Sequence, residues 1–589
     1  MAERQGAVSR RTMLRGAAGV AAAGAVAGAM AGVPPRAAAD EQGRRVAVFG
    51  GGVAGLTAAH ELAERGFRVT VYERRALGGK ARSMPVPGTA RDGRPDLPGE
   101  HGFRFFPGFY RHLPDTMRRI PFPGNANGVH DNLVAAVEAR FSRRDGDDTI
   151  VPMGRAGRPW STPDDFVQTV GSVIATSAKM PMADALYFAN RMLVFDTSCD
   201  ARRFGQWENT PWRDFVGAGA RSREFRALLS RTLTTLLVAA KDEYASTRTI
   251  GTMGEQFLGN PLETTNDGPL DRVLDGPTNE AWIDPWVRLL RDLGVRFVTA
   301  EVRGLDMLGG RIGRARIVDG SGAESSVAAD HFVLAVPVEV ARGLWTPEIL
   351  AVRPELAGLD RLVVDWMSGI QFYLRRPAQI ARGHVAYVDS PWSLTSVAQN
   401  QFWSRTKLSG YGDGTVQDCL SVDISDWSTP GTLVRKPAAE CTHDEIAREV
   451  WAQLRDHLKG AAQLSDSDLH SWYLDAGITW DAARRRNNNA DPLLINTVGS
   501  WSARPRPHGA LENLFLAGDY VRTDVDLATM EGACEAARAA VNALLDVAGS
   551  DAERCRLYTL YRAPGLEPLR QLDAQRYAAG QPNQFDIPV

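Results

Sequence analysis

The sequence is poor in cysteine and nearly balanced in charge. Its five cysteines are scattered over 589 residues, and neither they nor the ten histidines show the spacing of a metal site or a disulfide framework. The formal net charge is −2 at pH 7, which argues against nucleic acid as a partner, because binding to a phosphate backbone requires a basic surface. We therefore expect no metal and no nucleic acid. The composition, 44% hydrophobic and 23% charged, predicts a globular protein with a large core.

Long runs of large apolar residues are also lacking. The weakly apolar residues 16–33 are mainly alanine and glycine, too poor in leucine, isoleucine and phenylalanine to predict a membrane span. Arg10 and Arg11 precede this stretch and residues 37–39, all alanine, follow it. The order resembles a twin-arginine export signal with a small-residue cleavage site, the alternative being a tail with an accidental arginine pair. We interpret residues 1–39 as a signal that exports the folded protein to an extracytoplasmic or secreted location.

Glycine is plentiful and forms a motif after the first expected strand. Residues 45–49 are typical of a short buried strand, and residues 50–55 follow with the sequence Gly-Gly-Gly-Val-Ala-Gly. Apolar residues at helical spacing come next, and a second strand, 68–72, ends at Glu73. This strand, turn, helix and strand are the context that a dinucleotide-binding G-x-G-x-x-G motif requires.

Each glycine of the motif has an expected role. Gly50 permits the tight turn, Gly52 lets the backbone approach a pyrophosphate, and Gly55 allows close packing of helix on strand. The helix N-terminus supplies partial positive charge. Glu73 would accept hydrogen bonds from ribose hydroxyls and repel a 2′-phosphate, which disfavours NADP but does not separate NAD from FAD. The residues expected at the dinucleotide are Gly50, Gly52, Val53, Ala54, Gly55 and Glu73.

A second glycine pair follows Glu73 closely. Gly78 and Gly79 would let the backbone approach the cofactor again, and Lys80 and Arg82 can pair with its phosphates. From here the sequence resembles the superfamily of flavin amine oxidases and carotenoid desaturases. It departs from that pattern in one respect, since the glycine pair lies one residue closer to the ribose carboxylate than is usual in the family.

A C-terminal motif favours FAD over NAD. Residues 514–520 (Leu-Phe-Leu-Ala-Gly-Asp-Tyr) are typical of a buried strand that ends at an acidic residue, and a helix is expected over residues 527–545. Gly518 allows close backbone approach, and Asp519 can bond the ribityl chain or reach the pyrophosphate through water. Backbone N–H groups at Met530 and Glu531 would point at the pyrimidine edge of the flavin, where reduced flavin carries negative charge.

This motif resembles the FAD motif of plant-type phytoene and ζ-carotene desaturases. A further match is residues 99–108 (Gly-Glu-His-Gly-Phe-Arg-Phe-Phe-Pro-Gly), and the similar segment of those enzymes passes over the isoalloxazine ring. In the family a valine at the position of Val302 touches adenine. The resemblance covers roughly residues 44–545. It adds Gly102, Phe103, Arg104 and Val302 to the expected cofactor contacts.

The resemblance implies FAD as the cofactor and an α/β fold. A Rossmann-like FAD-binding domain of the glutathione reductase type would be interleaved with an α+β substrate-binding domain. By elimination, the substrate domain is built from the segments between the cofactor motifs. We expect residues 1–39 to form the signal and residues 551–589 a C-terminal helix and tail. The FAD-binding domain would comprise residues 40–120, 275–345 and 490–550, and the substrate domain residues 121–274 and 346–489.

We expect an FAD-dependent oxidoreductase that acts on an apolar, isoprenoid or carotenoid-like substrate. As a desaturase or dehydrogenase it would pass a hydride to the flavin while a proton leaves the neighbouring carbon; related enzymes also isomerise double bonds or remove a hydroxyl. The electron acceptor, oxygen or a quinone, and a peripheral membrane contact stay open. His101 and Arg104 are candidate catalytic residues, because polar residues in an aromatic run need a partner when buried.

Two other functions are weighed against this one. A flavin amine oxidase is disfavoured because residues 526–529 lack the cage tyrosine typical of those enzymes and residues 370–374 lack their lysine, although Trp501 could form half a cage and is a third catalytic candidate. A non-catalytic prenyl-binding escort protein shares the architecture, but intact cofactor motifs are unexpected there.

Overall fold

A seven-stranded sheet contains the strands of both glycine motifs. In the computed structural model, which describes residues 44–153, 162–258, 260 and 265–586, its order is β11-β10-β9-β2-β1-β12-β22. The strands from β9 to β22 pair in parallel, and β10 and β11 extend the sheet as antiparallel strands. The strands are β1 (Arg45–Phe49), β2 (Arg68–Glu73), β9 (Arg296–Leu308), β10 (Arg311–Asp319), β11 (Glu324–Val327), β12 (His331–Leu334) and β22 (Leu514–Leu516). The predicted export signal, 1–39, lies outside the described residues.

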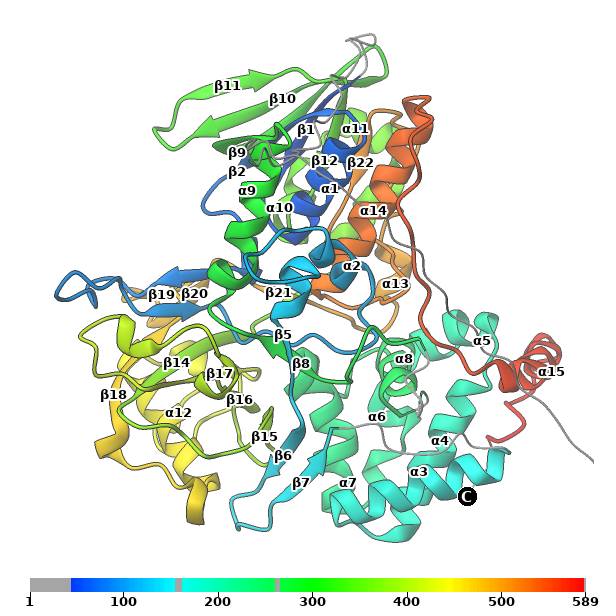
Figure 1. Cartoon of the computed structure of the whole chain (residues 1–589). Helices are drawn as coiled ribbons and strands as arrows, with labels where there is room; N and C mark the ends of the chain where they lie inside the picture. Colours follow the sequence, from blue (N-terminus) through cyan, green and yellow to red (C-terminus); the bar gives the residue numbers. More distant parts are fainter. Residues whose placement is uncertain (1–43, 154–161, 259, 261–264, 587–589) are drawn as a thin grey trace, which may run out of the picture. The chain divides into compact units, whose positions relative to one another are not determined.

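Both faces of this sheet are covered. On one face Val46 and Val48 of β1 pack against helices α1 (Val53–Glu64), α9 (Asp284–Asp292) and α14 (Met530–Val547). Ala47 and Phe49 point to the other face, toward α10 (Val338–Ala341) and α11 (Pro347–Val352). Figure 1 shows α14 beside α1, so the helices that follow the two glycine motifs are neighbours. The continuous apolar character of the strands follows from burial on both sides.

A second seven-stranded sheet has the order β18-β14-β17-β16-β15-β6-β7. One face carries Ile370, Phe372 and Val422, which pack against helix α12 (His443–His457). Alternate residues point to the opposite face. The strands are β6 (Glu138–Ser142), β7 (Thr149–Pro152), β14 (Ser368–Leu374), β15 (Val385–Tyr387), β16 (Leu394–Ala398), β17 (Asp418–Ile424) and β18 (Leu469–Leu474).

Helices fill much of the chain between residues 163 and 258. They include α3 (Pro163–Ala178), α4 (Met182–Asp196) and α8 (Thr247–Leu258), together with a π-helix, Arg226–Leu236. The two sheets and these helices make a mixed α/β architecture, as predicted. Within the described residues, no helix is both long and apolar enough to cross a membrane.

Some element boundaries differ from those predicted. The helix expected over 527–545 begins at Met530, because the Thr529 hydroxyl caps it by accepting a hydrogen bond from the Gly532 N–H at 3.0 Å. The C-terminal segment does not begin as a helix, and its helix, α15, spans Glu567–Ala578. Side chains elsewhere satisfy the backbone of the preceding stretch; Asn542, for example, bonds both the N–H and the carbonyl of Cys555.

Candidate active site

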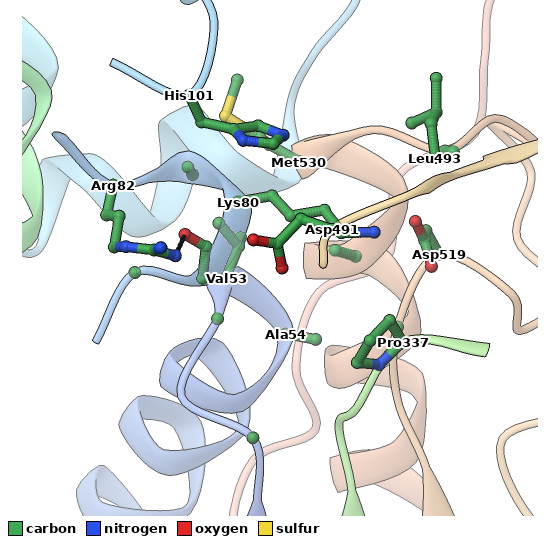
Figure 2. A pocket seen from close by; sticks show the side chains of 18 of the residues that line it. Val53, Ala54, Lys80, Arg82, His101, Pro337, Asp491, Leu493, Asp519 and Met530 are labelled. Carbon is green, nitrogen blue, oxygen red and sulfur yellow. Dashed lines mark hydrogen bonds between the residues drawn. The ribbon is translucent and has the colours of Figure 1, made fainter. Parts of the chain in front are cut away.

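One cavity joins the N-terminal and C-terminal glycine motifs. Its volume is about 390 Å³, within the range of cofactor and ligand sites. Figure 2 shows Val53 and Ala54 at the start of α1 on one side and Asp519 on the other. The structure therefore brings together the two segments whose meeting the sequence predicted. The predicted site residues that line the cavity are Gly50, Gly52, Val53, Ala54, Glu73, Gly78, Gly79, Lys80, Arg82, His101, Gly102, Phe103, Arg104, Val302, Gly518, Asp519 and Met530.

The two N-terminal glycine segments run side by side. Gly78 donates its N–H to the Gly51 carbonyl at 2.8 Å, and Gly52 and Gly78 form a parallel bridge. Gly50 has a φ of +102°, and a Cβ atom there would lie 2.3 Å from the Ala335 carbonyl oxygen. A Cβ atom on Gly52, in contrast, would meet nothing nearer than the Gly79 Cα at 3.7 Å. The turn thus leaves open space beside Gly52, a cradle that a larger side chain would fill.

Glu73 is held at the end of β2 beside this cradle. Its Oε2 accepts a hydrogen bond from the Gly51 N–H at 2.7 Å, and its Oε1 accepts one from the Arg75 N–H at 2.9 Å. Each carboxylate oxygen can accept a second bond. The position and the remaining acceptor capacity fit the predicted contact with ribose hydroxyls.

Lys80 and Arg82 line the cavity but are already engaged by the protein. The Lys80 ammonium donates to the Pro492 carbonyl and lies 3.9 Å from the Glu339 carboxylate. The Arg82 guanidinium donates to the Gly79 carbonyl at 2.6 Å, the bond drawn in Figure 2. Their predicted pairing with phosphates stays a prediction.

Three predicted site residues lie outside the cavity lining. A Cβ atom on Gly55 would lie 1.9 Å from the Gly50 carbonyl oxygen, so this glycine serves the close packing expected of it. The Glu531 carboxylate points away from the cavity and accepts the backbone N–H groups of residues 111–113, at 2.7 to 2.9 Å, and the His112 ring. Trp501 packs 5.2 Å from Phe204, ring to ring, beneath the Arg248 guanidinium. Glu531, whose backbone N–H was expected at the flavin, and Trp501, expected as half of an aromatic cage, therefore form no part of the cavity wall.

His101 and Arg104 lie where the sequence placed them, at the cavity. The His101 ring contacts the Asp475 carboxylate, and Arg104 donates to the Gly102 carbonyl at 2.5 Å. Arg104 also lies 3.9 Å from Glu100, a buried carboxyl whose pKa burial raises. The segment is therefore a charged wall of the cavity.

The sequence analysis missed an acidic residue at the same wall. Asp423 of β17 lines the cavity, and a Cβ atom on Gly102 would lie 2.7 Å from its Oδ1. Burial raises the pKa of Asp423 to about 7, although Arg104, His101 and His384 act in the opposite direction. The available signal was an aspartate near the end of a short strand that contains Cys, Leu, Val and Ile, because a charged residue is seldom buried without a purpose.

A smaller cavity of about 120 Å³ adjoins the first. Phe105, Tyr110, Met367 and Leu493 line both, so the two spaces share a wall. The smaller one continues into apolar surroundings. Its further lining includes Phe109, Val238, Met253, Phe257, Leu494 and Leu527.

The sequence matches one protein family over most of its length. The model of the family described as flavin containing amine oxidoreductase matches residues 53–545. A carotenoid phi-ring synthase of Streptomyces griseus is 46% identical over 76 residues, 13% of this chain and 14% of that protein. A carotenoid phi-ring synthase of Chlorobaculum tepidum is 24% identical over 301 residues, 50% of this chain and 43% of that protein. The chain thus spans less than half the length of these curated relatives.

Solved structures share the fold at low sequence identity. An oxidoreductase from Methanosarcina mazei has a TM-score of 0.54 at 12% identity and covers 85% of this chain and 100% of its own. Cyclohexylamine oxidase from Brevibacterium oxydans IH-35A has a TM-score of 0.54 at 15% identity, with coverage of 86% and 98%. Putrescine oxidase has a TM-score of 0.57 at 13% identity, with coverage of 86% and 99%. At this identity the likeness establishes the fold.

Proposed function

Because the chain belongs to the flavin-containing amine oxidoreductase family, and is thus an FAD-dependent oxidoreductase, we propose that it oxidises a C–H bond of an apolar substrate. When bound, FAD supplies a two-electron acceptor for hydride. The cradle at Gly52, the carboxylate of Glu73 and the close approach at Gly518 fit this cofactor. The chain's own residues then bind the substrate, exclude water and handle a proton.

The observation that carries the proposal is the apolar extension of the cofactor cavity. Beyond Thr529, the smaller cavity is bounded by side chains such as Val238, Met253 and Phe257. Apolar walls favour a hydrocarbon substrate, because burial of apolar surface is what they stabilise. The substrate class that we propose is isoprenoid or carotenoid-like, and the names of the two curated relatives support it. We propose desaturation as the reaction, with oxygen or a quinone as the final electron acceptor. The protein would obtain its substrate through peripheral contact with a membrane.

Amine oxidation is the alternative, and the electrostatics of the cavity disfavour it. Asp423, which lies against residues 101–103, is faced by the Arg104 guanidinium. This cation repels an ammonium ion. Trp501, the candidate for half of an aromatic cage, packs against Phe204 instead. The likeness to amine oxidases in the solved structures concerns the fold alone.

Anaerobic reduction of the bound flavin tests the proposal. Purified protein is mixed without oxygen with an apolar polyene in detergent, or with aliphatic amines, and the flavin absorbance is followed. We expect the polyene to bleach the flavin and the amines to leave it oxidised. Rapid bleaching by simple amines, with none by polyenes, would replace our proposal with the alternative.

We also propose that residues 1–39 direct export of the folded, FAD-loaded protein. The paired Arg10 and Arg11 before an alanine-rich stretch support this. Replacing both arginines by lysine should retain the protein in the cytoplasm, as fractionation would show. Unchanged export of that variant would contradict the proposal.

A further inference from the structure

Two polar side chains that stand side by side in the cavity each have an oxygen without a hydrogen-bond partner among the described residues. Asp423 of β17 and Thr395 of β16 are paired directly in the sheet, so they point to the same face. Both line the cofactor cavity and are more than nine-tenths buried. Among the described residues, neither the Asp423 Oδ1 nor the Thr395 Oγ1 has a hydrogen-bond partner.

Glycines bring the wall segment close to this pair. Residue 369, opposite Asp423 on β14, is a glycine, and a Cβ atom there would lie 2.7 Å from the His101 carbonyl oxygen. Gly102 leaves room for the Asp423 carboxylate in the same way. The Asp423 carboxylate is thus placed against residues 101–103, the segment predicted to pass over the isoalloxazine ring.

An unpaired carboxyl in this position is costly to folding. Burial of a carboxylate without full hydrogen bonding is unfavourable, and native proteins retain such groups chiefly where they serve binding or catalysis. The charged groups that face it are Arg104 and His101 from the wall segment and His384 before β15, while the Phe103 N–H is directed at it. His101 is itself paired with Asp475, and His384 with Asp271. Within the part of the chain that the structure describes, no hydrogen bond accounts for the free Oδ1.

We propose that Asp423, with the Thr395 hydroxyl beside it, is the catalytic residue that accepts the substrate proton. This inference rests on the proposed function. Bound FAD would supply the two-electron acceptor for the hydride that leaves when one C–H bond of the substrate breaks. The C–H bond of the neighbouring carbon breaks, its proton goes to the Asp423 carboxylate, and its electron pair forms the new C=C bond. The substrate loses two hydrogens, and Asp423 becomes a neutral acid that later releases the proton.

The ionisation of Asp423 suits this role. A base is most effective when its pKa lies near the working pH, and the pKa of Asp423 is raised to about 7. The rate of flavin reduction should therefore rise with pH through about 7, as the carboxyl loses its proton.

The test compares Asp423→Asn with Asp418→Asn in the full-length holoenzyme. Asp418 is a buried aspartate of the same strand, but its carboxylate accepts the backbone N–H groups of Ala378, Asn400 and Cys419. With a polyene substrate, we expect Asp423→Asn to slow anaerobic flavin reduction at least 100-fold and to remove the pH dependence, with FAD affinity unchanged. Asp418→Asn should keep the pH profile of the wild type.

A second readout does not depend on turnover. Infrared difference spectra of the apoprotein between pH 5 and pH 9 should show a protonated carboxyl band that is lost near pH 7, absent from Asp423→Asn and present in Asp418→Asn. An unchanged rate and pH profile in Asp423→Asn, with a polyene-active wild type, would overturn the assignment alone. If only amines reduced the flavin of the wild type, both the proposed function and the assignment of Asp423 would be overturned. Loss of FAD binding in Asp423→Asn would show a structural role and also overturn the assignment.

Discussion

The backbones of Gly52 and Gly79 approach so closely that a Cβ atom on Gly79 would lie 2.9 Å from the Gly52 Cα. The relation is not symmetrical, since a Cβ atom on Gly52 would lie 3.7 Å from the Gly79 Cα. Gly79 also has a φ of +56°, whereas Gly52 has a φ of −78°. Glycine is therefore needed at position 79 for the conformation and packing of the backbone. Glycine is needed at position 52 because it leaves space for the cofactor.

Alanine at these two positions should separate folding from cofactor binding. Gly79→Ala should destabilise the apoprotein by about 1–2 kcal/mol, the cost of a left-handed conformation for a residue with a Cβ atom. Gly52→Ala should leave the melting temperature of the apoprotein unchanged and weaken FAD binding at least tenfold, because its methyl group enters the cradle. Thermal melts of apoprotein and fluorescence titration with FAD measure the two effects. Wild-type FAD affinity in Gly52→Ala would contradict this interpretation of the cradle.

An acid-sensitive ion cluster joins the helices behind the two glycine motifs. Burial would raise the pKa of Glu61 on α1, but Arg119, Arg538 of α14 and Arg65 lower it to about 2. The unfolded value is about 4.3. Because the folded pKa is depressed, the stabilisation is complete above pH ~4.3 and is lost as the pH falls toward 2. It amounts to roughly 3 kcal/mol.

Glu61→Gln should reduce the loss of stability that the wild type shows as the pH falls. We expect the urea midpoint of the wild type to fall between pH 5 and pH 3 more steeply than that of the variant, whose stability is lower at pH 7. Parallel curves for the two proteins would show that Glu61 does not titrate as described.

The Asp423 carboxyl should affect the pH dependence of stability in the direction opposite to that of Glu61. The folded pKa of Asp423 is raised to about 7, so the carboxyl favours folding at low pH and opposes it as the pH rises through 7. The variant should therefore melt at a higher temperature than the wild type at pH 8.5, while the difference shrinks or reverses at pH 5. A lower melting temperature of the variant at pH 8.5 would show that the ionised carboxylate stabilises the fold.

Several site residues could be predicted because backbone geometry dictates them locally. Gly50 adopts a φ of +102° in a tight turn, a conformation that favours glycine in any tertiary context. Asp423 could not be found in this way. Its place at the cavity depends on the pairing of β17 with β14 and β16 and on the approach of residues 101–103, a segment more than 300 residues away in the sequence.

Glu531 shows the converse error. Its backbone N–H was expected to point at the flavin from the first turn of α14, but Glu531 does not line the cavity. The carboxylate instead anchors the start of α2 (His112–Arg118), whose N–H groups need acceptors. Sequence periodicity locates a helix start, but it does not say which distant backbone a side chain will meet.

Blocking the apolar extension of the cavity should prevent substrate binding without affecting flavin binding. Met253 lines only the smaller cavity, and tryptophan there would fill the space. We expect Met253→Trp to retain FAD and its absorbance spectrum but to slow flavin reduction by a polyene at least tenfold. Met182→Trp, at an exposed position, controls for the added ring. Equal rates in Met253→Trp and the wild type would place the substrate elsewhere.

A buried ion pair holds the C-terminal segment against the helical region. Arg202 of α5 (Asp200–Gly205) donates its Nε–H to Asp573 of α15 at 3.0 Å, and both side chains are at most 2% exposed. The same carboxylate accepts the Cys199 N–H and the side-chain amide of Asn583. The predicted C-terminal tail therefore packs on the protein through a specific, fully desolvated contact.

Asp573→Ala should destabilise the protein by about 3–5 kcal/mol, because it leaves the Arg202 charge buried and unpaired. Asp546→Ala removes an exposed partner of Arg554 and should cost at most about 1 kcal/mol. Replacing both members of the buried pair, as in Arg202→Met with Asp573→Leu, should recover only part of the loss, because the unpaired charge is removed but the Cys199 N–H and the Asn583 amide still lose their acceptor. Urea unfolding followed by tryptophan fluorescence measures all three. If Asp573→Ala cost no more than Asp546→Ala, the pair would be solvated in solution, and the C-terminal segment would have to be held by its apolar contacts instead.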